Sequence, residues 1–311
     1  MTDDALDYYG RPALKPPVWT WEVPAYFFVG GASGAAAVIA AVAHRLGGSE
    51  DLVRHARWIA AASTIASPPL LISDLGRPER FLNMLRVFKV QSPMSVGVWT
   101  LVAFSNAGVA ATFADLVERR AGGHLVARVV RDAAEVVGAA TGLVLSTYTG
   151  VLLGATAIPV WSKNATLLPV HFGASAVGSA VSMLELFGHH DRALNRLGIG
   201  TALVETGMAA HIETSDEPTL RDLRTGQAGT LLRAAGILSG PLPLLLRLVG
   251  GRTPGARRLA ALSTIAGSLL TRVAWIEAGR SSASRLTASS IADGSTLEKH
   301  RRSSDSPAGS A

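Results

Sequence analysis

The chain contains no cysteine among its 311 residues. Without thiols it cannot form disulfides, bind an iron–sulfur cluster through cysteine, or use a thiol as a nucleophile. Charged side chains are also scarce: they make up 17% of the chain, against roughly 25% in an average soluble domain. The absence of cysteine excludes a secreted domain held together by disulfide bonds. The low share of charged residues argues against a soluble enzyme.

The chain lacks the pair of deeply placed histidines that a haem would need as ligands. Ligation of haem by two histidines requires a pair deep in facing helices, and only His171 falls at such a depth in the sequence pattern. The adjacent pair His189–His190 falls at the end of an apolar run, too isolated to predict a structural metal site. Three further histidines are expected in loops: His44, His55 and His124. We therefore expect no haem and no metal centre in this chain.

Long apolar runs are what the chain has in abundance. Hydrophobic residues make up 48% of it, and its mean hydropathy is +0.30. They gather into runs of about 20 residues, which is the length that crosses about 30 Å of hydrocarbon at 1.5 Å per residue. Residues 1–18 are polar and lack the apolar core of a cleavable signal peptide, so we expect none. The pattern predicts a multi-pass protein of the cell membrane.

The runs predict an all-α membrane protein with eight transmembrane helices. Glu205 and His211 interrupt the sixth, and the polar, serine-rich segment 281–311 is predicted to be a disordered tail. Residues 1–20 are expected to lie outside the membrane, with four helices in 21–160 and four in 161–280. The predicted helices span about 21–43, 54–75, 95–117, 128–155, 166–187, 193–212, 227–250 and 258–278. The glycine-rich stretch 30–34 predicts close helix packing rather than a phosphate-binding loop, because no strand precedes it.

An even number of helices places both termini on one side of the membrane, which we call the termini side. Ionisable groups inside spans cost at least about 2.5 kcal/mol each on insertion scales, which makes them candidate functional residues. Those near a helix end can instead extend to water at little cost. The candidates expected toward the termini side are Glu22, Tyr26, Asp74, Arg77, Tyr148 and His171, and those toward the opposite side are Asp132, Glu135 and Glu185.

The positive charges favour one orientation. Lysine and arginine in the loops are slightly in excess on the side opposite the termini, so the termini side is expected to be extracytoplasmic. The net charge of +6 resides mostly in short loops, where membrane proteins keep it. We therefore expect membrane lipid rather than nucleic acid as the partner of these charges.

The segment Asp74-Leu-Gly-Arg-Pro-Glu-Arg-Phe81 follows the second apolar run directly. Pro78 disfavours the helical conformation of Arg77, so the helix is expected to end there with a carboxylate and a guanidinium at the membrane boundary. A quinone head suits such a place: its carbonyls need hydrogen-bond donors and its reduction takes up protons. Residue types alone leave a proton-coupled transporter site equally open.

Several motifs in the same order resemble the NrfD/PsrC family of integral membrane subunits. The resemblance extends from about Tyr8 to Ser281. The motifs are Asp74 to Phe81, Trp19-Thr-Trp-Glu-Val-Pro-Ala-Tyr26, Ser92-Pro-Met-Ser-Val-Gly-Val-Trp99, Tyr148-Thr-Gly-Val-Leu-Leu153, Ile158-Pro-Val-Trp161 and Arg272-Val-Ala-Trp-Ile-Glu-Ala-Gly-Arg-Ser281.

The resemblance implies eight transmembrane helices in two four-helix bundles and a menaquinone or ubiquinone site without haem. It implies a four-cluster ferredoxin-like iron–sulfur partner and a molybdopterin catalytic subunit. The family's quinone-site tyrosine corresponds to Tyr148, and the Asp and Arg of its Asp-Leu-Gly-Arg-Pro motif correspond to Asp74 and Arg77. Where some members place Asn and His at the start of the first helix, this chain has Glu22 near the Asn position and Ala25 or Tyr26 near the His position.

We thus expect a quinone-reactive membrane subunit of a multi-subunit oxidoreductase. Tyr26, Tyr148 and His171 would bind the quinone, Glu22 and Asp74 would carry protons, and Arg77 would stabilise negative charge. Asp132, Glu135 and Glu185 would form a proton path from the opposite side. Two alternatives are open: a proton-coupled secondary transporter, which would have broken helices near the midplane, and a purely structural anchor.

Overall fold

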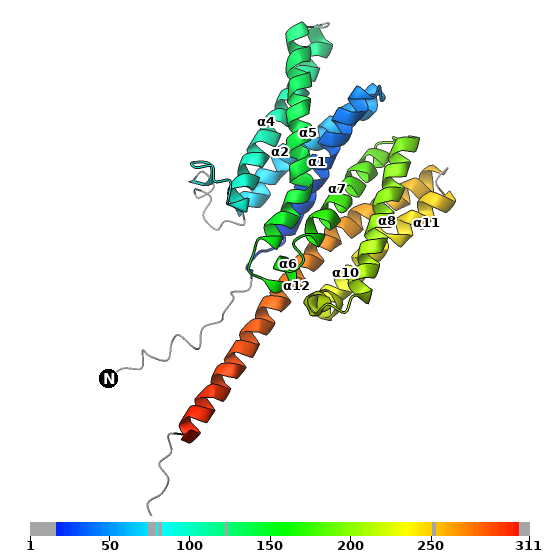
Figure 1. Cartoon of the computed structure of the whole chain (residues 1–311). Helices are drawn as coiled ribbons and strands as arrows, with labels where there is room; N and C mark the ends of the chain where they lie inside the picture. The colour runs from blue at the N-terminus through cyan, green and yellow to red at the C-terminus, as the bar shows by residue number, and fades with distance from the viewer. Residues whose placement is uncertain (1–16, 74–78, 80–82, 122–123, 251–252, 305–311) are drawn as a thin grey trace, which may run out of the picture.

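The computed structural model describes residues 17–73, 79, 83–121, 124–250 and 253–304, with side chains up to position 285. Every regular element in these ranges is helical (Figure 1). The elements are α1 (Glu22–Arg45), α2 (Glu50–Ser73), α4 (Pro93–Ala121), α5 (Leu125–Gly154), α6 (Pro159–Ser162), α7 (Leu167–Leu186), α8 (Arg192–Thr214), η1 (Pro218–Leu220), α9 (Arg221–Arg224), α10 (Gly226–Ser239), α11 (Pro241–Gly250) and α12 (Pro254–Ser304).

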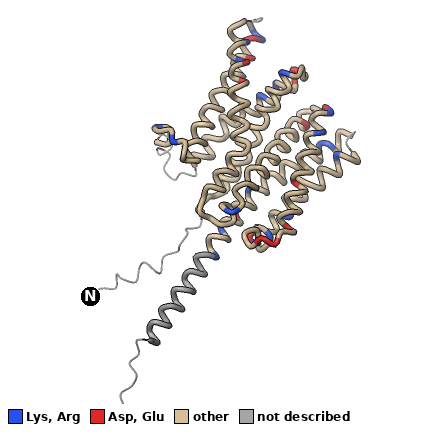
Figure 2. Tube along the Cα trace, in the orientation of Figure 1, with Lys and Arg blue, Asp and Glu red and all other residues tan. Residues whose placement is uncertain are grey.

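Six stretches of the described helices are long and apolar enough to cross a membrane. They are 22–45, 93–120, 125–154, 167–186, 226–250 and 254–285. The fifth combines α10 and α11, which meet at Gly240. Figure 2 shows the charged residues mostly near the helix ends, with the central parts of the helices largely uncharged. The prediction of a multi-pass membrane protein is confirmed at this level.

All eight predicted helices have counterparts that start within a few residues of the predicted positions. Among the described residues, two of these helices, α2 and α8, are not apolar enough to count as candidate membrane spans. The first turns of α2 carry Glu50, Asp51 and Arg54, and α8 carries Arg192, Arg196 and Glu205. The structure therefore supports six spans, and the assignment of α2 and α8 to the membrane stays a prediction.

Helix α1 lies at the centre of the molecule, in contact with α2, α5 and α7 (Figure 1). Helix α4 packs on α5 and α2, while α12 packs on α10, α7 and α11. The helices before and after residue 160 meet mainly where α7 contacts α1 and α5. Large buried side chains fill this region, among them Phe27, Leu145 and Phe172.

The glycine-rich stretch of α1 serves helix packing, as predicted. A Cβ added to Gly34 would lie 2.4 Å from the carbonyl oxygen of Gly142 on α5, and one added to Gly142 would lie 2.6 Å from the carbonyl oxygen of Gly34. Backbones that approach this closely leave room for hydrogen only. The small residues therefore hold α1 directly against α5.

The prediction of a disordered tail from Ser281 is wrong for residues 281–304, because α12 continues through them to Ser304. Figure 1 shows this part of α12 extending away from the other helices. Once α12 has formed, each further residue adds a hydrogen bond at little entropic cost. No proline occurs between Pro254 and Pro307 to stop it, and alanine, leucine, glutamate and lysine favour the helix.

Candidate functional site

An apolar cavity of about 90 Å³ lies on the termini side, where α1 begins, α2 ends, α4 begins and α5 ends. Two residues of its otherwise mostly hydrophobic lining carry a hydroxyl group, Tyr26 and Tyr148, and both are buried. The lining comprises Trp19, Val23, Tyr26, Phe27, Leu70, Leu71, Met84, Met94, Gly97, Val98, Tyr148 and Leu152. Sites for small organic ligands usually combine such a lining with a volume of about 300–1,000 Å³, so the side chains around this cavity would have to move apart to admit one.

Tyr148 is held against the first turn of α4. Its hydroxyl donates a hydrogen bond to the carbonyl oxygen of Pro93, at 2.5 Å. The ring lies directly over Gly97, where an added Cβ would be 2.0 Å from Cζ and 2.1 Å from the hydroxyl oxygen. The glycine in the motif Ser92 to Trp99 therefore makes the space that the tyrosine of α5 occupies.

Three tryptophans, Trp19, Trp161 and Trp275, contact one another in series at the same end of the molecule. The ring of Trp19 stacks on that of Trp161, with centroids 5.4 Å apart, and Trp161 donates from its indole nitrogen to the carbonyl oxygen of Trp275, at 2.8 Å. Arg280 donates to the carbonyl oxygen of Trp19. Three of the motifs that resemble the NrfD/PsrC family thus meet beside the cavity: those containing Trp19, Trp161 and Trp275.

Not every predicted residue reaches this cavity. Asp74 and Arg77 lie outside the described residues, although Leu70 and Leu71, which precede them, line the cavity. Glu22 begins α1 and accepts a hydrogen bond from the Thr20 hydroxyl, but it is not part of the lining. The structure thus brings together Tyr26 and Tyr148 of the predicted set.

His171 belongs to a different group of buried side chains, between α7, α8, α10 and α12. The indole nitrogen of Trp275 donates to Nδ1 of His171 at 3.2 Å, and Nε2 lies 3.2 Å from Oε2 of Glu205. The hydroxyl of Ser239 donates to the same carboxylate oxygen at 2.9 Å. Because Nδ1 accepts from an indole, which is only a donor, the imidazole proton resides on Nε2 and is donated to Glu205.

The prediction from sequence overlooked Glu205 as the partner of His171. It noted the glutamate only as an interruption of a helix. An ionisable residue in the middle of an apolar run needs a polar partner on a neighbouring helix, and His171 is the partner that the fold supplies. The fully buried Arg272 lies nearby and donates to the hydroxyls of Ser175 and Ser268, at 2.9 and 2.7 Å.

A polar cavity of about 350 Å³ lies at the opposite end of α1, α2, α4 and α5. It is lined by His44, Gly48, Glu50, Val53, Arg57, Asp115, Glu118, Arg119 and Arg131. At its base Arg57 bridges two helices: it donates from Nε to Glu135 of α5 at 2.7 Å and from a terminal nitrogen to Asp115 of α4 at 2.8 Å. Arg57 and Glu135 are both buried.

Arg57 and Glu135 also line a second, smaller cavity of about 30 Å³ that lies among small residues and Phe104. The Arg57–Glu135 pair thus separates the polar cavity from the interior of these four helices. His44, which we expected in a loop, lies in the last turn of α1 and contacts Glu135, with Nδ1 and Oε2 2.5 Å apart. His55, also expected in a loop, lies within α2.

The three residues predicted for a proton path do not lie together. Asp132 and Glu135 are neighbours on α5, beside His44. Glu185 lies instead between α7 and α11, fully buried, where both of its oxygens accept hydrogen bonds from Arg247 at 2.7 Å. It lines neither the polar cavity nor the small one beside it. Its surroundings are those of a structural ion pair.

These features define an all-helical membrane protein with an apolar, tyrosine-bearing cavity at one membrane face and a charged cavity at the other. The family described as "Polysulphide reductase, NrfD" matches residues 12–191, and the chain belongs to that family. The C subunit of the polysulfide reductase of Wolinella succinogenes is 27% identical over 186 residues. That alignment covers 55% of this chain and 58% of the relative's length.

The family match contains both cavities. Residues 12–191 run from before α1 to just after α7, and they include Tyr26, Tyr148, Arg57 and Glu135. Helices α8 to α12 lie beyond it. The helices that build the apolar cavity are therefore the ones that carry the family resemblance.

Proposed function

We propose that this chain is the quinone-reactive membrane subunit of a multi-subunit oxidoreductase. It exchanges electrons and protons between menaquinone or ubiquinone and an iron–sulfur partner subunit. The chain has no cysteine with which to hold an iron–sulfur cluster itself, and we assign it no haem. The observation that carries the proposal is the cavity in which Tyr26 and Tyr148 are part of an otherwise mostly apolar lining.

The chemistry of a quinone fits that cavity in three respects. Apolar side chains favour the ring and the isoprenoid tail. The tyrosine hydroxyls are donors for a quinone carbonyl. Asp74 and Arg77 follow the α2 residues that line the cavity, so we propose them as a proton carrier and an electrostatic stabiliser, with Glu22 as a further proton carrier. His171 is left out, since both of its ring nitrogens are engaged by Trp275 and Glu205.

The test is titration of the purified complex with a quinol analogue, together with quinol turnover. Arg77→Ala is expected to weaken binding by about tenfold, because a hydrogen bond to a charged group is worth about 1.5–3 kcal/mol. Tyr148→Phe is expected to lower turnover, because it removes a hydroxyl that would donate to the quinone carbonyl in the reaction. Thr147→Val is the matched control: it is the neighbouring residue on α5, and its hydroxyl bonds only within its own helix. Unchanged affinity and turnover in both variants would place the quinone elsewhere.

We also propose that Asp132 and Glu135 begin a proton path from the opposite side, with Glu185 no longer part of it. Support comes from the polar cavity, whose lining includes Arg57 and His44, both in contact with Glu135, and from the small cavity that Glu135 itself lines. In vesicles, Glu135→Gln is expected to slow proton uptake from that side during quinol turnover, while Glu118→Gln, in the same cavity, leaves it unchanged. Equal rates in the wild type and both variants would assign Glu135 a role in packing alone.

The architecture proposed with this function is two four-helix bundles. The first, in residues 21–160, contains α1, α2, α4 and α5, and the second, in residues 161–280, contains α7, α8, α10–α11 and α12. In support, each set has extensive contacts within itself. The proposed partners are a four-cluster ferredoxin-like subunit and a molybdopterin catalytic subunit on the termini side, which we propose to be extracytoplasmic.

One observation favours the alternative of a proton-coupled transporter. The span of α10 and α11 is broken at Gly240, and the residue before the break, Ser239, donates to the buried carboxylate of Glu205. A broken helix beside a buried charge is typical of transporter sites. Co-purification distinguishes the two: an iron–sulfur protein should accompany a quinone-reactive subunit or an anchor, but not a transporter. Such a partner with no quinone binding would indicate the purely structural anchor.

A further inference from the structure

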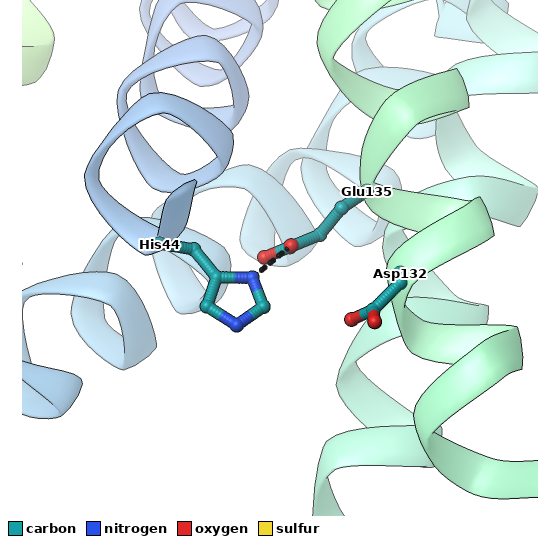
Figure 3. A group of neighbouring side chains, drawn as sticks. All are labelled: His44, Asp132 and Glu135. Atoms are coloured by element: carbon teal, nitrogen blue, oxygen red, sulfur yellow. Dashed lines mark hydrogen bonds and ion pairs between the residues drawn. The ribbon is translucent and has the colours of Figure 1, made fainter. Parts of the chain in front are cut away.

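Three side chains that can ligate a metal ion converge beside the polar cavity, and one of them, His44, is part of its lining. They are His44 in the last turn of α1 and Asp132 and Glu135 on α5, one turn apart (Figure 3). One ligand atom from each lies within 4.8 Å of the other two. Figure 3 shows the imidazole of His44 and both carboxylates pointing toward one another from two facing helices. Sequence patterns did not predict this group, because His44 was expected to lie in a loop.

Each carboxylate uses one oxygen for a neighbouring arginine. Oε1 of Glu135 accepts from Arg57, and Oε2 faces His44. Oδ1 of Asp132 accepts two bonds from Arg131, at 2.9 and 3.0 Å, while Oδ2 has no protein partner among the described residues. One oxygen of each carboxylate is therefore available while the other is held in place. Hydrogen bonds that orient ligands in this way are usual around metal sites in proteins.

The distances suit a small ion after a modest adjustment. Zinc binds imidazole nitrogen and carboxylate oxygen at about 2.0–2.2 Å, so ligand atoms on a tetrahedral ion lie roughly 3.4 Å apart. Nδ1 of His44 and Oε2 of Glu135 are now 2.5 Å apart and would separate by about 1 Å to admit the ion. The side chain of His44 is 35% exposed and that of Asp132 is 47% exposed, which leaves them free to move.

The charge around the group also suits a cation. The cavity and the ligand group together carry five carboxylates, Glu50, Asp115, Glu118, Asp132 and Glu135, against three guanidinium groups, Arg57, Arg119 and Arg131. The cavity is open to solvent, with a volume of about 350 Å³, so an ion can reach the group from water. A ligand set of one imidazole and two carboxylates favours zinc over magnesium, which prefers an all-oxygen shell.

We propose that His44, Asp132 and Glu135 form a binding site for a divalent cation of the zinc class, with a fourth position open to water. Such an ion would tie the end of α1 to α5 beside the polar cavity. The site is independent of the quinone assignment, because it involves the opposite end of the helices and none of the residues that line the apolar cavity.

The test is equilibrium dialysis of the full chain, purified in detergent without a polyhistidine tag, against radioactive zinc. We expect one zinc per chain at this site and at least about tenfold weaker binding in His44→Ala and in Asp132→Asn, since each variant removes one of three ligands. Zinc X-ray absorption should report nitrogen and oxygen ligands only. Equal binding in the wild type and both variants, or displacement of zinc by millimolar magnesium, would overturn the proposal.

A second pair of histidines needs a control. Nδ1 of His55 and Nε2 of His189 are 2.8 Å apart, and burial together with His55 lowers the pKa of His189, which leaves its imidazole neutral and able to bind zinc. The measurement is therefore made in a His189→Ala background. Glu118→Gln serves as the matched control, because Glu118 lines the same cavity but is not one of the three ligands. A loss of binding in Glu118→Gln equal to that in His44→Ala would indicate attraction by the whole cavity and would overturn the site.

The result of the zinc measurement is also informative about the proposed proton path through Glu135, but the two proposals can fail separately. If zinc binds and quinol turnover is unaffected, the path through Glu135 is wrong and the metal site stands. If zinc does not bind, the metal site is wrong, and the Glu135→Gln measurement still decides the path.

Discussion

Replacing Gly97 with alanine is expected to lower quinol turnover by about tenfold or more while leaving assembly of the complex intact. The added Cβ would lie 2.0 Å from the ring of Tyr148, which no pair of carbon atoms tolerates, so the tyrosine must move. Its hydroxyl then loses its position in the cavity. A displaced ring moves the hydroxyl away from the reacting quinone and changes the shape of the apolar lining, and a misplacement of about 1 Å at a reacting group can lower the rate by more than tenfold. Turnover and quinol-analogue affinity, measured on the purified complex, check the expectation.

The control for this change is Gly200→Ala on α8. That position is helical too, but an added Cβ there meets no atom within 4 Å. Alanine in a helix is slightly more favourable than glycine, so Gly200→Ala should keep full turnover. The losses from Gly97→Ala and Tyr148→Phe should also be less than additive, because both act through the same hydroxyl. Normal turnover in Gly97→Ala would show that the position of Tyr148 does not matter for the reaction.

Replacing Arg247 with methionine is expected to destabilise the chain by about 3–5 kcal/mol, the usual effect of leaving one member of a buried ion pair without its partner. The side chains of Arg247 and Glu185 are 1% and 0% exposed, and the arginine bonds both carboxylate oxygens at 2.7 Å. Arg257 is the nearest remaining cation, at 3.7 Å from Glu185. Unfolding of the purified chain in mixed detergent micelles measures the loss.

Two comparisons make this result specific. The double variant with Glu185→Leu and Arg247→Met should recover most of the stability, since apolar residues of similar volume often replace a buried pair without loss. Arg233→Met breaks the exposed pair with Glu213, where both side chains are at least half exposed, and should have little effect. If Arg247→Met were as mild as Arg233→Met, Glu185 would have another source of compensation, and its assignment as a structural group would fall.

Helix positions were predictable from the sequence because each depends on an apolar run of sufficient length. The starts of α5 and α7, for example, fall within a few residues of the predicted ones. The proximity of Tyr26 and Tyr148 followed from the family resemblance and the alternating direction of the helices. Both residues lie near the same membrane face in any such arrangement, so no knowledge of side-chain contacts was needed.

The partners of the buried charges were not predictable in the same way. Whether Arg57 meets Glu135, or Glu205 meets His171, depends on how each helix is rotated about its axis, and a single sequence does not determine that rotation. His44 was expected in a loop because it directly follows the first apolar run, and no partner was predicted for Arg57, which lies within α2. Pairing removes much of the cost of burying them, which allows the helices to extend further than hydropathy alone predicts.

The hydrogen bond between Tyr148 and the carbonyl of Pro93 has a thermodynamic consequence for any quinone that enters the cavity. The phenol proton is already engaged, so a quinone carbonyl would exchange one hydrogen bond for another and gain little enthalpy from it. The free energy of binding must then come mainly from the packing of the ring and its tail against the apolar side chains of the cavity, in place of their contacts with lipid. Because a quinone would enter the cavity from lipid rather than from water, its binding should show only a small heat-capacity change.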